Sequence, residues 1–179
     1  MRIGIDIDGT INNFQDVATD ILKREHGLDW SGDTYEIYKG MTIAQIQEFT
    51  DKYEDEFIRA VSPLENSCEV IRNWINQKHQ VYLITARGYS MAEHTMTWLR
   101  RNSVFYTDIY FNCGDKVDCC KWKDVQVMIE DSPHNLKSLN KNNVPYVIFD
   151  QKYNKDIYGG LLRTSDWLKI EDFVNFYDV

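Results

Sequence analysis

The chain contains 179 residues, of which 43% are hydrophobic and 27% are charged, and its 20 lysines and arginines oppose 28 acidic residues for a formal net charge of −8. This composition excludes wholesale disorder, no apolar run reaches the roughly 18 residues that span a bilayer, and the length suits one domain with a modest insertion. We therefore expect a soluble, cytoplasmic protein whose negative charge disfavours long nucleic acid as its main partner.

The first predicted strand covers residues 2–8, RIGIDID, and is followed by an unusually long interval. The second predicted strand begins only at Gln80, although a β-α-β unit needs about 30 residues in total. Residues 14–61 are surplus to that crossover, yet their apolar residues recur at helical spacing and a capping box begins at Thr42. We predict a small helical cap over 14–61, inserted into a core that comprises 1–13 and 62–179.

The remaining segments alternate between helices and strands. Capping boxes that begin at Ser62 and Ser90 predict two helices, and Ser132 followed by Pro133 predicts a third. A closing helix over 166–177 is expected to be capped by Ser165. The further strands are expected at 80–85, 107–111, 125–129 and 145–149, which are apolar enough to be buried on both faces. The alternation predicts a doubly wound, Rossmann-like α/β fold with a parallel sheet of about five strands.

Acidic and hydroxyl side chains follow several of these strands. Asp6 and Asp8 share one side of the first strand, because side chains alternate along a strand. Thr85 ends the second strand, and Glu130 and Asp131 end the fourth. In an open α/β sheet this carboxyl edge is where ligands bind, so we expect these side chains to converge there.

Such a group of carboxylates needs a cation. Unit charges about 4 Å apart repel by about 4 kcal/mol at an effective dielectric of 20. A ligand set made only of oxygen atoms favours Mg²⁺ over Zn²⁺. Lys116, which follows Gly114-Asp115, can add a fixed positive charge, and Lys121 and Lys123 compete with it for this role.

A carboxylate nucleophile beside a second carboxylate, a hard cation, a lysine and a hydroxyl indicates phosphoryl transfer. Asp6 would attack phosphorus and form an aspartyl-phosphate, and Asp8 would protonate the leaving oxygen and then activate water. Lys116 and Thr85 would stabilise the phosphoryl oxygens. The expected substrate and phosphate contacts are Thr10, Thr85, Ala86, Arg87, Lys116, Tyr35 and Tyr38.

The order of these motifs resembles that of the haloacid dehalogenase superfamily of phosphatases. It runs Asp-x-Asp-Gly-Thr, a hydrophobic run ending in threonine, a lysine and an acidic pair. The opening Ile-Asp-Ile-Asp-Gly-Thr and the runs at 84–87 and 128–132 resemble more closely the 5′(3′)-deoxyribonucleotidase-like branch, which includes bacterial and phage nucleotidases. The insert looks like that superfamily's cap placed after strand one.

The resemblance implies roles for the acidic residues. Asp6 would be the nucleophile and a metal ligand, Asp8 the general acid and base with its backbone carbonyl facing the metal, and Asp131 the downstream ligand. Glu130 would support the ligands without binding the ion itself. Many relatives carry two aspartates where this chain has Glu130-Asp131, which leaves the division of metal contacts between the two open.

Several of these residues also have ordinary structural interpretations. Asp6 and Asp8 could be solvated acids in a turn, and Arg87 could form a structural ion pair instead of binding phosphate. Each aromatic residue of the insert could either form its core or face a nucleobase, and Tyr35 and Tyr38 are expected to face the ligand because they lie in a loop. These aromatics are Trp30, Tyr35, Tyr38, Phe49, Tyr53 and Phe57. The cysteines, which lack metal-binding spacing, are expected to be reduced thiols: Cys68, Cys113, Cys119 and Cys120.

The interpretation that best fits these observations is a Mg²⁺-dependent phosphomonoesterase acting on small nucleoside monophosphates. Two alternatives remain: a phosphatase of nucleic-acid ends or of another small phosphometabolite, and a catalytically idle module that binds a phosphorylated ligand. The expected partner is a small phosphorylated substrate rather than a membrane. The sequence leaves open whether the chain acts alone or as a homodimer.

Overall fold

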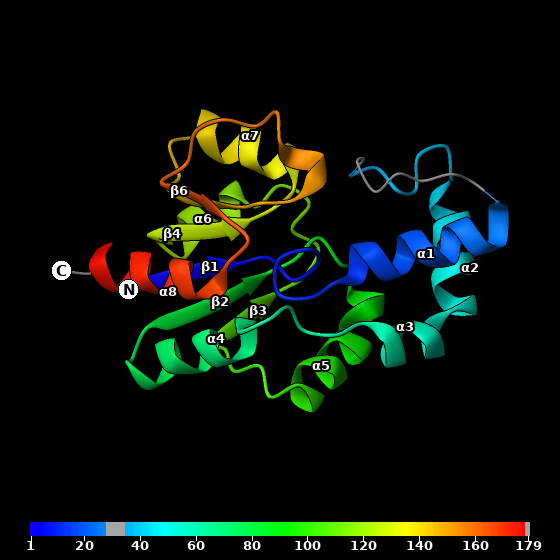
Figure 1. The fold of residues 1–179 in the computed structure, drawn as a ribbon, viewed down its shortest axis with the longest axis horizontal. Helices are drawn as coiled ribbons and strands as arrows, with labels where there is room; N and C mark the ends of the chain where they lie inside the picture. Colours follow the sequence, from blue (N-terminus) through cyan, green and yellow to red (C-terminus); the bar gives the residue numbers. More distant parts are fainter. Residues whose placement is uncertain (28–34, 178–179) are drawn as a thin grey trace.

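The fold is built on a parallel β-sheet of six strands. The computed structural model describes residues 1–27 and 35–177, and its strands lie in the order β3-β2-β1-β4-β5-β6 (Figure 1). The strands are β1 Arg2–Ile5, β2 Gln80–Ile84, β3 Asp108–Tyr110, β4 Val127–Glu130, β5 Tyr146–Phe149 and β6 Leu162–Thr164. The predicted doubly wound α/β fold is confirmed. The sheet has one strand more than expected, because β6 spans only three residues and gives no recognisable apolar run.

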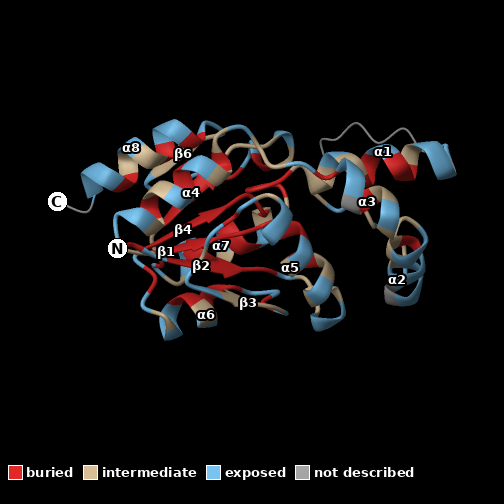
Figure 2. Cartoon of the chain, turned by 90° about the horizontal axis from the view of Figure 1, so that it is seen from below, coloured by how far each residue is buried: buried red, intermediate tan, exposed pale blue. Residues whose placement is uncertain are grey.

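Helices cover both faces of this sheet. They are α1 Phe14–His26, α2 Ile43–Lys52, α3 Glu54–Ala60, α4 Ser67–Asn76, α5 Ala92–Arg101, α6 Val117–Trp122, α7 Pro133–Lys141 and α8 Trp167–Tyr177, with short 3-10 turns η1 Tyr89–Met91 and η2 Lys152–Asn154. One face packs against α4, α5 and α8, and the other packs against α6 and α7 (Figures 1 and 2). Within the described residues, no helix combines the length and the apolar character needed to cross a bilayer.

The central strand β1 lies between β2 and β4, and its carboxyl end leads into the candidate site. Its Ile5 pairs with Leu83 of β2 and with Ile129 of β4. Ile5 packs into the layer of α4 and α8, whereas Gly4 faces the other layer. A Cβ on Gly4 would lie 2.7 Å from the Met128 sulfur, so the lack of a side chain lets β1 approach that layer without displacing Met128.

Two tryptophans fix the layer formed by α4 and α8. Trp74 and Trp167 are fully buried, with their ring centroids 6.0 Å apart. A buried aromatic side chain removes about 150–250 Å² from water, which stabilises the fold by about 4–6 kcal/mol. The indole N–H of Trp167 also donates to the backbone carbonyl of Thr10 at 3.1 Å. The C-terminal helix therefore supports the loop that follows β1.

The helices α1, α2 and α3 lie beyond the carboxyl end of the sheet (Figure 1). The aromatic rings of Phe49, Tyr53 and Phe57 pack together there. The centroid of the Phe49 ring lies 5.2 Å from that of Tyr53 and 5.9 Å from that of Phe57. These three rings form the small core of this group of helices. The segment that enters these helices and the segment that leaves them lie side by side, since the Asn13 backbone N–H donates to the Ser62 carbonyl at 3.1 Å. Trp30 lies outside the described residues.

Two of the predicted helix starts are wrong. The helix expected from Ser62 begins at Ser67, after Asn66 in the left-handed conformation. The intervening backbone pairs with the outgoing chain instead, since the Leu64 N–H donates to the Ile11 carbonyl at 2.8 Å. At Ser90 the chain forms the 3-10 turn η1, and α5 follows without a side-chain cap. Tertiary pairing and a tighter turn replace both capping boxes.

Other local predictions agree with the structure or differ in detail. Thr42 accepts a hydrogen bond from the Gln45 N–H at 3.3 Å, and Ser132 accepts one from the Asn135 N–H at 3.5 Å. The apolar residues with helical spacing after Thr42 fall into two helices, α2 and α3, which are separated at Tyr53. The closing helix begins at Trp167, and the Asp166 carboxylate, rather than Ser165, accepts from its second N–H group at 3.0 Å.

Candidate active site

Three buried carboxylates meet at the carboxyl end of β1 and β4. Asp6 directly follows β1, whereas Glu130 ends β4 and Asp131 follows it. Because β1 and β4 are neighbours, one oxygen from each of these three side chains lies within 4.8 Å of the others. Asp6 is 6% exposed, and Glu130 and Asp131 are 0% exposed. The structure thus brings Asp6 to two acids that lie more than 120 positions away in the sequence.

A single lysine lies between two of these acids. The Lys116 ammonium contacts the Asp6 carboxylate and lies 2.6 Å from Glu130 Oε2. Its side chain is 1% exposed and extends from the residue that precedes α6. The two competing lysines point elsewhere, since Lys121 donates to Asn142 and Lys123 lies over the Trp122 ring. Lys116 is therefore the cation that the fold brings to the carboxylates.

The charges in this group are unbalanced. Burial raises the pKa of Asp6 to about 7, which Lys116 partly opposes and Glu130 and Asp8 reinforce. Burial, followed by the nearby Asp6 and Glu130 charges, also raises the pKa of Asp131 well above its usual value. For Lys116 burial alone would lower the pKa, but the Asp6 and Glu130 carboxylates outweigh it and raise the pKa. Three acids facing one lysine leave negative charge that a divalent cation would neutralise.

Glu130 is held by the backbone around it. Its Oε1 accepts hydrogen bonds from the backbone N–H groups of Asp131 at 3.1 Å and Ser132 at 2.9 Å. Its Oε2 accepts from Lys116 at 2.6 Å. Both carboxylate oxygens are thus engaged by the protein, which fits an acid that orients Lys116 and the following turn.

Asp131 is oriented by residues from three segments. Thr10 Oγ1 donates to Asp131 Oδ1 at 3.0 Å, and the Tyr153 hydroxyl donates to Asp131 Oδ2. The Asn154 side-chain amide donates to the Asp131 backbone carbonyl at 2.8 Å. Tyr153 and Asn154 belong to η2, just after β5, and sequence reasoning did not identify them. Their position after a strand at the same carboxyl edge was the available signal.

The turn after β1 admits only glycine at position 9. Gly9 has a φ of +78°, and a Cβ there would lie 2.4 Å from Asp131 Oδ2 and 2.6 Å from the Tyr153 hydroxyl. The Gln151 side-chain amide donates to the Gly9 carbonyl at 2.6 Å. The segment after β5 therefore contacts both the turn after β1 and the end of β4.

Asp8 lies apart from the buried acids and is paired with Arg87. Arg87 Nε donates to Asp8 Oδ2 at 2.8 Å, and its Nη2 donates to Asp8 Oδ1 at 2.5 Å. Arg87 Nη1 also donates to Thr95 of α5 at 2.9 Å. Asp8 retains 24% exposure of its side chain, in contrast to Asp6. The two-point pair leaves Arg87 at the edge of the site, with its guanidinium 5.3 Å from the Phe14 ring.

Thr85 and Ala86 occupy the turn after β2. Thr85 is 1% exposed, and its hydroxyl accepts a hydrogen bond from the Arg87 backbone N–H at 3.1 Å. Its carbonyl accepts from the Cys113 N–H at 2.9 Å. Ala86 is exposed. These contacts connect the end of β2 with the segment that carries Lys116.

A cavity of about 430 Å³ opens beside Asp8. Its lining residues are Asp8, Phe14, Gln15, Tyr35, Glu36, Ile37, Tyr38 and Lys39. The Tyr38 hydroxyl is buried without a hydrogen-bond partner among the residues that the structure describes. Burial, followed by the charge of Asp8, raises the pKa of Tyr38. The ring centroids of Tyr35 and Tyr153 lie 5.4 Å apart. Tyr35 and Tyr38, the two tyrosines expected to face a ligand, therefore both lie at the site.

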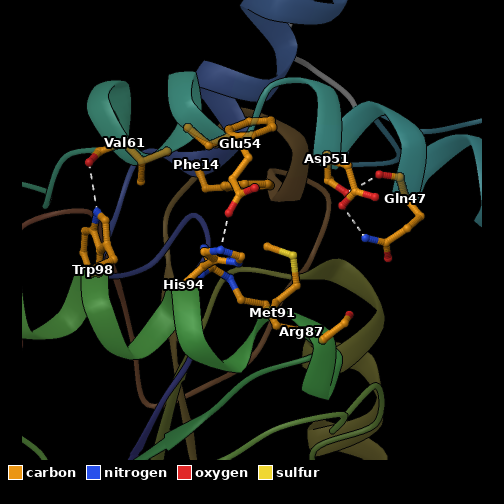
Figure 3. A pocket seen from close by; sticks show the side chains of 12 residues that line it. Phe14, Gln47, Asp51, Glu54, Val61, Arg87, Met91, His94 and Trp98 are labelled. Carbon is orange, nitrogen blue, oxygen red and sulfur yellow. Dashed lines mark hydrogen bonds and ion pairs between the residues drawn. The ribbon is translucent and has the colours of Figure 1, made fainter.

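A smaller cavity of about 80 Å³ lies between the inserted helices and α5 (Figure 3). Its polar wall includes the contact between Glu54 and His94, which joins α3 to α5. The Trp98 indole N–H donates to the Val61 carbonyl at 2.9 Å. This space is too small for a nucleoside, since ligand pockets measure about 300–1,000 Å³. Its lining residues instead connect the inserted helices to the body of the molecule.

The donor set suits a hard divalent cation. Asp6, Glu130 and Asp131 are the acidic group within the described residues that could hold a metal, and all of their donor atoms are oxygen. Histidine nitrogen and thiolate sulfur, which zinc prefers, do not belong to this group. The surplus of buried negative charge gives an independent reason for a cation. The residues therefore fit a magnesium-type ion.

The chain matches a known protein family along almost its whole length. Residues 1–177 match the family model described as "5' nucleotidase, deoxy (Pyrimidine), cytosolic type C protein". The chain is 28% identical to "Putative nucleotidase YqfW" of Bacillus subtilis (strain 168), over 98% of this chain and 94% of that protein. It is 22% identical to "Nucleotidase CA_C3379" of Clostridium acetobutylicum, over 98% of this chain and 94% of that protein.

A solved structure shares the fold. The haloacid dehalogenase-like hydrolase SP0104 from Streptococcus pneumoniae superposes with a TM-score of 0.70 over 97% of each chain, at 13% identity. The motif order, the buried acidic group and the family match over nearly the whole chain all lead to the same assignment. The chain therefore belongs to the 5′-nucleotidase family of that description, within the haloacid dehalogenase-like phosphatases, which are hydrolases of phosphoric monoesters.

Proposed function

We propose that this protein is a Mg²⁺-dependent phosphatase of small nucleoside monophosphates that acts through an aspartyl-phosphate on Asp6. The observation that carries the proposal is the buried Asp6 carboxylate, which contacts Lys116 and lies with Glu130 and Asp131 in one group of oxygen donors. The names of the family and of the curated relatives support a nucleotide as the substrate class. We place the reaction in the cytoplasm, which suits four free thiols.

The ion would be held by Asp6, Asp131 and the backbone carbonyl of Asp8, with Glu130 in support. When bound, Mg²⁺ supplies positive charge that offsets the negative charge of the phosphate oxygens. Thr10 and Tyr153 fix the Asp131 carboxylate by hydrogen bonds, so its orientation does not depend on the substrate. Lys116 would likewise orient the Asp6 carboxylate, because its ammonium contacts Asp6 Oδ1. The second oxygen, Oδ2, would then attack phosphorus.

The reaction proceeds by two displacements at phosphorus. In the first, an Asp6 oxygen bonds to phosphorus, the ester P–O bond breaks, and Asp8, which must enter this step in its protonated form, donates a proton to the leaving alcohol oxygen. In the second, Asp8 takes a proton from water, the hydroxyl oxygen bonds to phosphorus, and the bond between phosphorus and Asp6 breaks. Inorganic phosphate leaves and both aspartates return to their initial states.

Asp8 must first be released from Arg87. Both oxygens of Asp8 accept hydrogen bonds from the guanidinium of Arg87. A phosphate dianion offers the same two-point geometry to a guanidinium. We assign Arg87 a second role as a phosphate contact, because substrate arrival would exchange the Asp8 carboxylate for phosphate oxygens. This exchange would free Asp8 only when a substrate is present.

The helical insert over 14–61 would act as a cap over the substrate. The cavity beside Asp8 measures about 430 Å³ and falls within the usual range for small-molecule pockets. Phe14, Tyr35 and Tyr38 supply aromatic faces and a hydroxyl to its wall. Closure of the cap would exclude water from the phosphoenzyme until Asp8 activates a single molecule.

Phosphate release from a defined substrate panel tests this function. The panel contains nucleoside 5′- and 3′-monophosphates, sugar phosphates and a 5′-phosphorylated oligonucleotide, each with Mg²⁺ or with EDTA. We expect turnover to be fastest with the mononucleotides and to be lost in EDTA. Preference for the oligonucleotide would indicate a phosphatase of nucleic-acid ends. Binding without hydrolysis across the whole panel would indicate an idle module and would refute the proposal.

A further inference from the structure

Two thiols meet beside the segment that presents Lys116. Cys113 Sγ and Cys119 Sγ lie 2.8 Å apart, and neither sulfur is bridged. Cys113 lies in the loop after β3, and Cys119 lies in α6. A disulfide has an S–S distance of about 2.05 Å, so a shift of under about 1 Å separates this contact from a covalent bond.

Both ends of this segment are connected to the candidate site. Lys116 lies midway between the two cysteines in the sequence and contacts the Asp6 carboxylate. The Cys113 backbone N–H donates to the Thr85 carbonyl at 2.9 Å. In α6 the Cys120 N–H donates to the Lys116 carbonyl at 2.9 Å. A covalent link between positions 113 and 119 would therefore close a short loop around Lys116.

We propose that Cys113 and Cys119 form a site of reversible thiol oxidation, at which a low-molecular-weight disulfide converts the two thiols into an intramolecular disulfide and thereby slows turnover. The bond itself is independent of the proposed phosphatase function, whereas its effect on turnover rests on that function. The physical reason for the effect is the displacement of Lys116, since small misplacements of groups around a reacting centre reduce rates strongly.

Oxidation would proceed by thiol–disulfide exchange. Cys119 is partly exposed whereas Cys113 is buried, so a small oxidant reaches Cys119 first. The Cys119 thiolate bonds to one sulfur of the oxidant, whose S–S bond breaks to release one thiolate. Cys113 then loses its proton and bonds to the Cys119 sulfur, which releases the second small thiol. Two protein thiols are oxidised, and one small disulfide is reduced to two thiols.

The environment of the two thiols agrees with this order. Burial, followed by the hydrogen bond with Cys119, raises the pKa of Cys113 to about 12. A raised pKa keeps Cys113 protonated, so Cys113 is a poor nucleophile toward the free oxidant. It acts in the second step, on the mixed disulfide that Cys119 has formed. The neighbouring Cys120 is 1% exposed and packs into the layer formed by α6 and α7. Cys68 lies on α4, on the opposite face of the sheet, and serves as an internal comparison.

Tryptic mapping of the oxidised protein tests for the bond directly. Trypsin cleaves after Lys116, so Cys113 and Cys119 fall in the separate peptides 102–116 and 117–121. After incubation of the full chain with oxidised glutathione and alkylation, we expect these peptides to appear as one linked species that dithiothreitol separates. Cys119→Ser should abolish the link, while Cys120→Ala and Cys68→Ser should retain it. Unlinked peptides in the oxidised wild type would overturn the proposal, as would a link that persists in Cys119→Ser.

Phosphate release provides the second measurement. We expect oxidised wild type to turn over at least threefold more slowly than reduced wild type, and dithiothreitol to restore the rate. Cys119→Ser should match the reduced rate and resist the oxidant. Equal rates in the linked and reduced proteins would overturn the effect on turnover. If reduced wild type releases no phosphate from any substrate, the phosphatase function fails, and peptide mapping still decides whether the disulfide forms.

Discussion

Asp6 is the residue on which the chemistry depends. Its carboxylate is nearly inaccessible, contacts Lys116, and shares its surroundings with two further acids. A buried carboxylate with a raised pKa is a poor structural element, because burial of its charge costs free energy. This cost is more easily explained by a chemical role than by a role in stability.

Replacing the nucleophile should separate chemistry from folding. We expect Asp6→Asn to lower the turnover number by at least about 1,000-fold, because the amide cannot form the phosphoenzyme. The folded state should be retained, since the change removes a buried charge and keeps the side-chain shape. Phosphate release and thermal unfolding measure the two effects. Asp20→Asn, at an exposed position of α1, should leave both unchanged. Activity of Asp6→Asn within tenfold of wild type would exclude the assignment.

The pKa of Asp6 also predicts a pH dependence of stability in the chelated protein. The pKa rises from 3.8 in the unfolded chain to about 7 in the folded state, mainly because of burial. The folded state therefore binds this proton more tightly, so the contribution is complete below pH 3.8 and is lost as pH rises toward about 7. The free energy of unfolding should fall by up to about 1.4 kcal/mol per pH unit in this window.

Urea unfolding in EDTA at several pH values between 4.5 and 6.5 measures this slope. Other groups titrate in the same range, so the comparison with Asp6→Asn isolates the contribution of Asp6. We expect the variant to lose less stability than wild type across this window. Parallel curves for the two proteins would show that Asp6 does not titrate as described.

At the scale of elements, the site is assembled from the ends of β1, β4 and β5. The turn η2 after β5 connects the ends of β4 and β5, since Asn154 donates to the carbonyls of Asp131 at 2.8 Å and Phe149 at 2.9 Å. Asn154 is 0% exposed, so its hydrogen bonds to these two carbonyls are shielded from water. The geometry of the acidic group is thus set partly by an element that carries none of its members.

Truncation of this side chain should weaken both stability and the site. Asn154→Ala leaves two buried carbonyls without a donor, at a cost of about 1–3 kcal/mol each. We expect the free energy of unfolding to fall by about 2–6 kcal/mol and turnover to fall at a fixed Mg²⁺ concentration. Urea unfolding and phosphate release measure these quantities. Asn140→Ala, at an exposed position of α7, is the matched control. Loss of stability no greater than that of the control would contradict the bridging role.

For the whole molecule, the acidic group creates a linkage between metal binding and folding. Asp6 is distant in the sequence from Glu130 and Asp131, and the three carboxylates meet only in the folded chain. An ion that binds this group therefore binds the folded state and not the unfolded chain. Binding of this kind raises the free energy of unfolding by about 2.7 kcal/mol when the ion is present at 100 times its dissociation constant.

Thermal unfolding in Mg²⁺ and in EDTA tests this linkage without any substrate. We expect Mg²⁺ to raise the melting temperature of wild type by about 5–10 °C, from 2–4 °C per kcal/mol for a chain of this size. Asp131→Asn should remove most of this shift, because it deletes one buried donor. An equal shift in wild type and Asp131→Asn would mean that the ion binds elsewhere.

The apolar pattern of the chain was sufficient to predict the layered α/β fold and the place of five of its six strands, β6 being the exception. Regular alternation places Asp6 and Asp8 on one side of β1, and parallel strands bring their carboxyl ends to a common edge. Thr42 and Ser132 cap their helices as expected, because each interaction spans only three residues. Local geometry of this kind is determined by neighbouring residues, so it can be predicted from the order of residues in the sequence.

Only the tertiary structure decided the contacts between distant segments. The capping box at Ser62 was overridden because the backbone there pairs with the chain leaving β1. The pairing of Arg87 with Asp8 and the hydrogen bond from Tyr153 to Asp131 depend on how turns pack at one edge. Such contacts depend on the distance between segments, which sequence periodicity does not contain. The sequence thus determined which residues could react, and packing determined which of them meet.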